Sequence, residues 1–397
     1  MIVEIRRPSI VNKDGKVTLT SDIYFGNEQK TIFYEIDSSY EKYIDLDNVN
    51  GFLMAILPYC MMKAKKHDEQ IIIKSDCCIS KILKFQLQRY LIPILAQNIS
   101  YYSCDIEIQI KGVEMFYPDS NGVATGVSGG VDSSYSILKN MKNQDYPLTH
   151  LLLGNIGIYG GGFNSKAEMV LEQRCERIAG AVGLPLVKIR SNACVDIYKK
   201  AFAPIVPFVF VSMVFSLPKL FKVYFFSSAF AVNDFCFSED DAAYYEIFTL
   251  AQLRTESISF YSSGSETTRL EKLRYIGNEK CIQDNLQVCL NVTEDGGNCN
   301  RCAKCSRTMA ELETLGILDK FCNVFDVDEF KKNQGYHWGY VLLKSWGKDP
   351  FYVELIRAKK LNGGVSPRIF FEALRKWKKR GFTTVNNKKE SVWEFVD

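Results

Sequence analysis

The stretch GVATGVSGGVDSSYSILKN, residues 122–140, constrains the fold most, because it joins an apolar run to a helix-like run through glycines and hydroxyls. Its composition predicts a strand over 123–127 and a helix over 133–141. Further strands are expected at 151–158, 186–189 and 222–227, and a capped helix at 164–182. Strands that alternate with helices are typical of β-α-β units. The predicted fold class is therefore α/β, with a doubly wound parallel sheet.

The loop between this strand and this helix has the chemistry of an anion site. A helix N-terminus presents free N–H groups and a partial positive charge, and glycines let a ligand approach the backbone closely. The loop is neither the lysine-containing phosphate loop nor the dinucleotide fingerprint. We expect it to hold a group of pyrophosphate size, although a helix cap on a flexible turn remains the simpler alternative. The expected contacts are Ser128, Gly129, Gly130, Val131, Asp132, Ser133 and Ser134.

Asp132 is unexpected in a phosphate site, because a carboxylate repels a phosphate. Two roles would reconcile it with the loop: a Mg²⁺ could lie between Asp132 and the phosphates, or Asp132 could orient the loop. The sequence leaves both open.

Four of the chain's 13 cysteines crowd together as C-x9-C-x2-C-x2-C, at Cys289, Cys299, Cys302 and Cys305. Two-residue spacing lets neighbouring thiolates converge on one ion about 2.3 Å away. Four sulfur ligands favour a structural Zn²⁺, with an iron–sulfur cluster, sulfur-carrying redox cysteines or free thiols as alternatives. The histidines His67, His150 and His337 have no ligand spacing and are expected to be structural.

Three regions are expected along the chain. Residues 1–118 have the mixed strand and helix pattern of a separate α+β domain, which ends in the turn cluster 117–122. Residues 119–325 form the α/β domain, including the cysteine segment 289–305. Residues 326–397 form a basic, mainly helical region, in which 366–380 has the pattern of an amphipathic helix.

Composition excludes some classes of protein. The chain is 397 residues long with 47% hydrophobic residues and a net charge of +3, which is ordinary for a globular protein and does not favour nucleic acid. The most apolar region, 201–226, is interrupted by Pro204, Pro207 and Pro218, so we expect a buried core element there and no membrane partner. Because most other cysteines are isolated and no signal peptide is evident, we expect a cytoplasmic protein.

The loop resembles a known signature. The residues Ser128-Gly129-Gly130-Val131-Asp132-Ser133 are similar to the SGGxDS loop of the PP-loop ATP pyrophosphatases. The resemblance implies an adenine-nucleotide α-hydrolase-like fold, and ATP cleavage between the α and β phosphates. It also implies transfer of AMP to a carboxylate or carbonyl-type oxygen, with ATP and Mg²⁺ as ligands.

The cysteine segment narrows this resemblance to 7-cyano-7-deazaguanine synthase, over roughly residues 122–322. That family combines an SGGxDS loop with a zinc segment and a nearby arginine, here Arg307. The stretch 266–272 is similar to a family segment and implies that Arg269 and Lys272 neutralise phosphate charge. From the residues alone, Thr268 and Glu271 form a capping box, which is equally typical of a solvated helix. Residues 228–234 lie where the family lines its substrate pocket.

The sequence therefore predicts an ATP-dependent adenylating carbon–nitrogen ligase that joins a small-molecule carboxylate to ammonia or an amine. Its zinc site would fix a lid over the active site. Three alternatives stay open: transfer of an activated 7-deazaguanine to a protein acceptor in antiphage defence, a PP-loop sulfurtransferase, and a zinc-containing nucleic-acid-binding module supported only by the basic tail. Homodimer formation also stays open.

Overall fold

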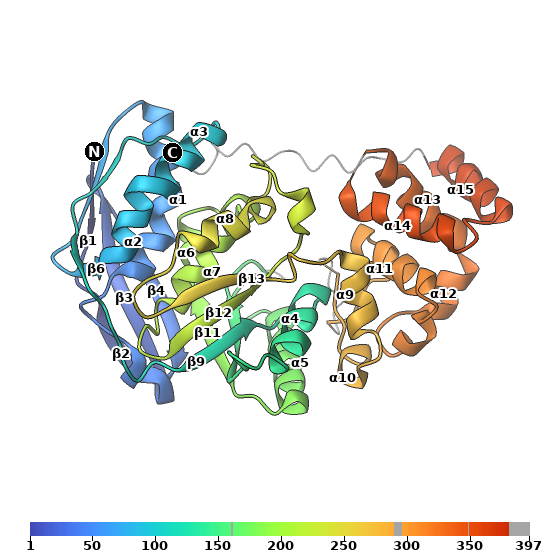
Figure 1. Cartoon of the computed structure of the whole chain (residues 1–397), viewed down its shortest axis with the longest axis horizontal. Coiled ribbons are helices and arrows are strands. Elements are labelled where there is room, and N and C mark those ends of the chain that lie inside the picture. Colours follow the sequence, from blue (N-terminus) through green and yellow to red (C-terminus); the bar gives the residue numbers. More distant parts are fainter. Residues whose placement is uncertain (160–161, 290–295, 348, 381–397) are drawn as a thin grey trace.

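The computed structural model describes residues 1–159, 162–289, 296–347 and 349–380, with the backbone alone for 376–380. Within these residues an 11-stranded sheet runs in the order β13-β12-β9-β10-β11-β4-β3-β1-β5-β7, with β2 paired to β3 (Figure 1). Its strands are β1 Ile2–Ile5, β2 Ser9–Lys13, β3 Lys16–Phe25, β4 Glu28–Asp37, β5 Ile71–Lys74, β7 Ile106–Ile108, β9 Gly122–Gly126, β10 His150–Asn155, β11 Leu186–Ser191, β12 Phe221–Ser227 and β13 Ser259–Ser263. A second, two-stranded sheet pairs β6 Cys78–Ser80 with β8 Lys111–Val113.

The helices lie on both faces of the large sheet and in a bundle at one end of the molecule (Figure 1). Their bounds are α1 Asn50–His67, α2 Lys81–Gln86, α3 Ile92–Asn98, α4 Val131–Met141, α5 Lys166–Val182, α6 Ala193–Asp196, α7 Val206–Val214, α8 Glu246–Ala251, α9 Arg269–Ile276, α10 Lys280–Gln283, α11 Ala303–Thr314, α12 Val327–Lys332, α13 Gln334–Trp346, α14 Pro350–Leu361 and α15 Pro367–Arg380. Short turns η5 Val232–Asp234 and η6 Ala242–Tyr244 follow β12.

The strands β13, β12, β9, β10 and β11 run parallel to one another, which confirms the predicted α/β class with a mostly parallel sheet. Alternate residues of β10 enter different cores. Leu151 and Leu153 pack in the core that contains α4 and α5, whereas Leu152 packs in the core that contains α1 and α7. The strand is buried on both faces, which explains its continuous apolar run.

The expectation of a separate N-terminal domain is corrected by the pairing of β4 with β11. This antiparallel pair continues the same sheet, with Ile189 opposite Ile36, and one hydrophobic core contains residues from both sides of position 118. The turn cluster that suggested a boundary is itself anchored. The Tyr117 hydroxyl donates to Asp45 at 2.7 Å, and its backbone N–H donates to Ser257 at 2.8 Å. A parallel sheet that ended at β11 would leave an open edge, and β4 covers it.

Two local expectations are confirmed near the sheet. The Ser165 side chain caps α5 by accepting from the Glu168 N–H, and Gly183 ends that helix in the left-handed conformation. The apolar region 201–226 contains the nine-residue helix α7, most of whose residues are buried. Across the described parts of the chain, we find no helix with the length and apolar character needed to cross a membrane.

The C-terminal helices α11 to α15 pack around one hydrophobic core together with apolar residues of α4 and α9, and Trp338 and Phe330 in this core are fully buried. The helical character predicted for 326–397 holds as far as residue 380, and the rest of that region lies outside the described residues. Ser306, His337 and Glu329 form a hydrogen-bonded series of 2.9 and 3.1 Å inside this bundle. Ser306 and His337 are both fully buried, so the series links helices and offers no accessible nucleophile.

Candidate active site and four-cysteine cluster

The loop 128–134 lies at the carboxyl ends of parallel strands, at the point where the strand order reverses. The chain passes from β9 to β10 and β11 on one side of β9, and then returns to place β12 and β13 on the other side. The crevice beyond such a reversal is where open α/β sheets bind ligands. The loop connects β9 to α4, and the segments after β12 and β13 end beside it.

Gly129 is required by the loop geometry. Its φ of +77° is in the left-handed region, and a Cβ there would lie 2.7 Å from Arg174 Cδ. Hydroxyls hold the turn from within, since Ser128 and Ser133 are 3.1 Å apart and Ser133 donates to the Gly130 carbonyl at 3.2 Å. The first N–H groups of α4 face this turn without intrahelical acceptors. The loop therefore has the backbone shape of an anion cradle.

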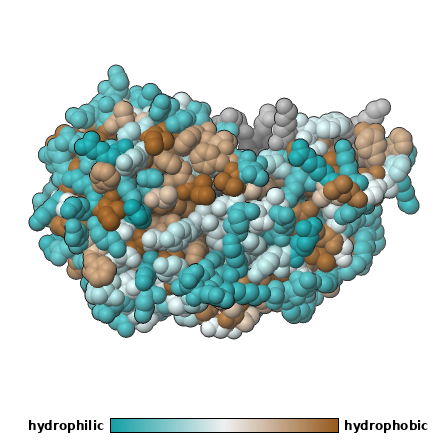
Figure 2. All heavy atoms as spheres, viewed as in Figure 1, coloured by the Kyte–Doolittle hydropathy of each residue, from teal (hydrophilic) through white to brown (hydrophobic). Residues whose placement is uncertain are grey.

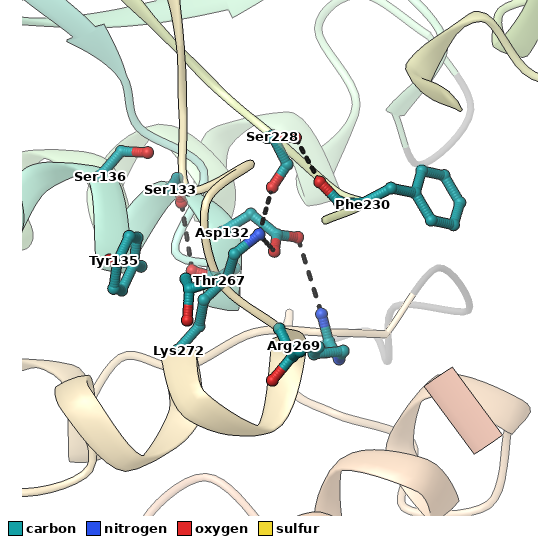
Figure 3. A network of polar contacts seen from close by, with 12 residues as sticks. Asp132, Ser133, Tyr135, Ser136, Ser228, Phe230, Thr267, Arg269 and Lys272 are labelled. Carbon is teal, nitrogen blue, oxygen red and sulfur yellow. Dashed lines mark hydrogen bonds and ion pairs between the residues drawn. The ribbon is translucent and has the colours of Figure 1, made fainter. Parts of the chain in front are cut away.

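Asp132, Arg269 and Lys272, which were predicted as one site, lie together (Figure 3). Lys272 Nζ is 3.3 Å from one oxygen of Asp132, and Arg269 Nη1 is 3.6 Å from the other. Lys272 also donates to the Ser228 carbonyl at 2.6 Å. The capping box of Thr268 and Glu271 is present and starts α9 at Arg269, so it sets the direction of both cations.

Two of the three cations of α9 are buried, which excludes the solvated-helix alternative for this segment. Arg269 is 7% exposed and Lys272 is 0% exposed. Arg307 from α11 is equally buried, and Glu311 is within 3.3 Å of Arg269 and 3.6 Å of Arg307. Three cations thus face two carboxylates, those of Asp132 and Glu311.

The pKa shifts follow from this crowding. Burial disfavours the charged form of Arg269, but the Glu311 and Asp132 carboxylates outweigh burial and raise its pKa. The pKa of Arg307 is lowered by burial and then by the positive charge of Arg269. Two guanidinium groups therefore repel each other in a place with little water, and an anion bound between them would relieve that repulsion.

Glu246 is a third acid beside this cluster, at the start of α8, and sequence reasoning did not find it. Its side chain is 2% exposed; one oxygen accepts from the Ser262 hydroxyl at 3.0 Å, and the other has no hydrogen-bond partner among the described residues. Burial raises the pKa of Glu246 to about 8, although the Ser262 hydrogen bond and the nearby charge of Lys272 act to lower it. At neutral pH this carboxyl is therefore mainly protonated, and the cations keep their excess charge.

Three aromatic side chains border the site on the side of the C-terminal helices. Phe230, after β12, stacks on Tyr244 with centroids 3.7 Å apart, and on Phe351 at 4.9 Å. Arg307 lies 4.4 Å above the centroid of Phe351. Within residues 228–234, Ser228 and Phe230 therefore lie beside the cation cluster. The contribution of Phe351 was not predicted, because it lies outside the region of resemblance.

The four predicted cysteines converge. Their sulfur atoms all lie within 4.8 Å of one another, with Cys289 and Cys302 at 3.6 Å and Cys299 and Cys305 at 4.0 Å. A tetrahedral ion with bonds of about 2.3 Å needs sulfurs about 3.8 Å apart. The group can therefore hold a metal ion. Hydrogen bonds, first from the Cys305 thiol, lower the pKa of Cys302 to about 5, so a thiolate is favoured there.

Buried polar groups hold the cysteine segment in shape. Asn298 accepts from the N–H groups of Val288 and Cys289 at 3.0 and 3.2 Å. Asn300 adopts a φ of +60°, in the left-handed region that asparagine tolerates better than most residues. Cys302 is the N-cap of α11 and accepts from the Cys305 N–H through its sulfur.

Residues within and just before the cysteine segment also hold the anion loop in place. The Gln287 N–H donates to the Gly129 carbonyl at 2.8 Å. Arg174, whose stem packs against Gly129, donates to the Gly296 carbonyl at 2.6 Å. The position of the loop therefore depends directly on these contacts with the cysteine segment.

A groove of about 1160 Å³ runs beside β13, at the edge of the sheet. It is lined by apolar and aromatic side chains, among them Phe85, Tyr90 and Tyr261, and by Ser262, which contacts Glu246. Figure 2, which has the same view as Figure 1, shows apolar side chains on the half of the molecule that contains the large sheet.

Comparison with known proteins finds no matching family model, no matching curated protein and no matching solved structure.

Proposed function

We propose that this chain is an ATP-dependent, AMP-forming carbon–nitrogen ligase of the PP-loop type, most like 7-cyano-7-deazaguanine synthase. The observation that carries the proposal is the buried excess of positive charge beside the loop 128–134. Arg269, Lys272 and Arg307 converge there on Asp132 and Glu311, at the reversal point of the sheet. Such an arrangement suits a polyphosphate, because each added anionic oxygen reduces repulsion among the cations.

The chemistry assigns a role to each group. The loop N–H groups and hydroxyls of Ser128, Ser133 and Ser134 bind the β and γ phosphates of ATP. A carboxylate oxygen of the second substrate attacks the α-phosphorus, the bond to the bridging oxygen breaks, and pyrophosphate leaves with its negative charge held by Lys272 and Arg269. Ammonia or an amine then attacks the acyl carbon, AMP leaves, and an amide results. A second dehydration would give a nitrile.

Asp132 has contacts that neither of its two expected roles included. Both of its oxygens already face cations, so its carboxylate orients Lys272 and Arg269. Its side chain is 27% exposed, so one oxygen remains accessible to a Mg²⁺ that arrives with ATP. Mg²⁺ would supply charge neutralisation on the phosphate oxygens.

We assign zinc to the four cysteines, since four thiolates at tetrahedral spacing favour that ion. Its contribution would be structural. By fixing the segment that includes Gln287 and Gly296, it would hold Gly129 and the loop in place, and α11 would carry Arg307 into the site.

A second candidate keeps the same activation step and uses an amine of a protein as the acceptor. The groove beside β13 supports it, because an edge strand can pair with an extended peptide and the groove lining includes Ser262, which donates to the buried Glu246. Sulfur transfer has less support. Cys175, which donates to the Val127 carbonyl behind the loop, is fully buried, and burial raises its pKa to about 12.

The decisive test is which nucleotide is released. We expect AMP and pyrophosphate from ATP in the presence of 7-carboxy-7-deazaguanine and ammonia, measured by chromatography. Asp132→Ala should lower the rate by about two orders of magnitude, since it leaves two buried cations without their partner. Release of ADP in place of AMP would contradict the proposal. Failure with this substrate, while ATP and pyrophosphate still bind, would contradict only the assignment of the substrate.

A further inference from the structure

Phe351 reaches the cation cluster from the C-terminal helical region, which is far from the loop in sequence. It is the second residue of α14, and its ring stacks on Phe230 at 4.9 Å with an angle of 20° between the planes. The guanidinium carbon of Arg307 lies 4.4 Å from the ring centroid, and that of Arg269 lies 5.8 Å from it. One ring therefore contacts both arginines of the site.

The position of the ring is fixed from both ends. Asp349 caps α14 by accepting from the Phe351 N–H at 3.1 Å, and Pro350 occupies the first helical position. On the other side, the Phe230 carbonyl accepts from the Ser228 hydroxyl at 2.8 Å, and the Ser228 carbonyl accepts from Lys272. The stack is thus continuous with the polar network that surrounds Asp132.

An aromatic ring affects two neighbouring guanidinium groups differently from a carboxylate. Glu311 attracts Arg269 and Arg307 and also cancels one unit of their charge. The face of a ring attracts cations through its quadrupole and leaves their net charge unchanged. Phe351 can therefore hold two mutually repelling arginines in place and keep their charge available to an anion.

We propose that Phe351 is a positioning residue of the anion site, which orients Arg269 and Arg307 for the pyrophosphate part of ATP, so that the C-terminal helical region completes the site. This inference rests on the proposed function, because it takes the anion to be pyrophosphate.

The test is binding of inorganic pyrophosphate and of ATP with Mg²⁺ to the full chain, measured by isothermal titration calorimetry. Phe351→Leu keeps apolar bulk and removes the ring face, and we expect it to weaken binding about tenfold, as for the loss of a desolvated cation–π contact. Phe351→Tyr and Phe351→Trp keep a ring and should stay within about threefold of wild type. Phe371→Leu, in the exposed part of α15, is the matched control and should bind as wild type.

A double-mutant cycle separates positioning from a general structural effect. If the ring acts through Arg307, Phe351→Leu should weaken binding much less in an Arg307→Met background than in wild type. Equal losses in both backgrounds, or wild-type affinity of Phe351→Leu, would overturn the inference and leave the proposed function standing. Absence of pyrophosphate and ATP binding in wild type would overturn both.

Discussion

Glu246 is a buried acid at the edge of a cluster that holds three cations. Its protonation state affects both the charge of the site and the folding stability of the chain. In the unfolded chain a glutamate loses its proton near pH 4.5, whereas burial raises the pKa of Glu246 to about 8 in the folded chain. Between these values the folded state binds the additional proton, so folding stability must fall as pH rises. The slope is at most about 1.4 kcal/mol per pH unit.

Glu246→Gln keeps the shape and the Ser262 hydrogen bond and removes the titration. We expect the variant to gain stability relative to wild type across this pH window, with the difference constant above it. Urea unfolding at pH values below, within and above the window measures this. Glu107→Gln, on the partly exposed face of β7, is the control. A difference between Glu246→Gln and wild type that does not change with pH would contradict the shifted pKa.

At the scale of single residues, the sequence was informative where the chemistry is local. The loop 128–134 and the four cysteines are short motifs whose spacing alone restricts geometry, and both were predicted. Glu246 and Phe351 were not, because an ordinary glutamate and phenylalanine acquire their roles from burial against residues up to about 120 positions away. Arg269 and Lys272 were singled out through resemblance, since a capping box alone fits a solvated helix equally well.

Helix α11 is the element that joins the cysteine cluster to the candidate active site. Its N-cap is Cys302, and one turn later it carries Arg307 and then Glu311. A metal ion bound at its first turn would therefore set the position of two charged residues in the site. Sequence could place the cysteines at a helix start but could not show that the same helix reaches Arg269, because that contact depends on packing of α9 against α11.

Cys302→Ser separates the role of Cys302 as a metal ligand from its role as the N-cap of α11. Serine is a better N-cap than most residues, so the variant keeps the start of α11 and loses one metal ligand. We expect elemental analysis to show about one zinc ion per wild-type chain and much less in the variant, with a lower melting temperature. Cys322→Ser, at an exposed cysteine, should change neither. Full zinc retention in Cys302→Ser would contradict assignment of this cluster as the metal site.

On the scale of the whole molecule, the junction between β11 and β4 decides whether the first 118 residues are a separate unit. The turn cluster 117–122 predicted a domain boundary, because turn residues between two sequence patterns usually mark one. Edge-to-edge pairing of strands leaves no such mark, since the hydrogen bonds are made by backbone groups. The shared core makes the two parts interdependent: Ile189 and Ile36, opposite each other, are both buried.

Ile189→Ala tests this interdependence, because it removes buried methyl groups at the junction and should cost about 2–5 kcal/mol. If one cooperative sheet crosses the junction, hydrogen exchange should accelerate by similar factors in β3 and β4 and in β10 and β11, since opening either part exposes the other. Faster exchange in β10 and β11 alone would mean that the N-terminal strands are stable without them. Leu312→Ala is the control, because it also removes buried apolar atoms but does so in the core that contains the C-terminal helices. It should lower protection there first, because that core is distinct from the one beneath the junction.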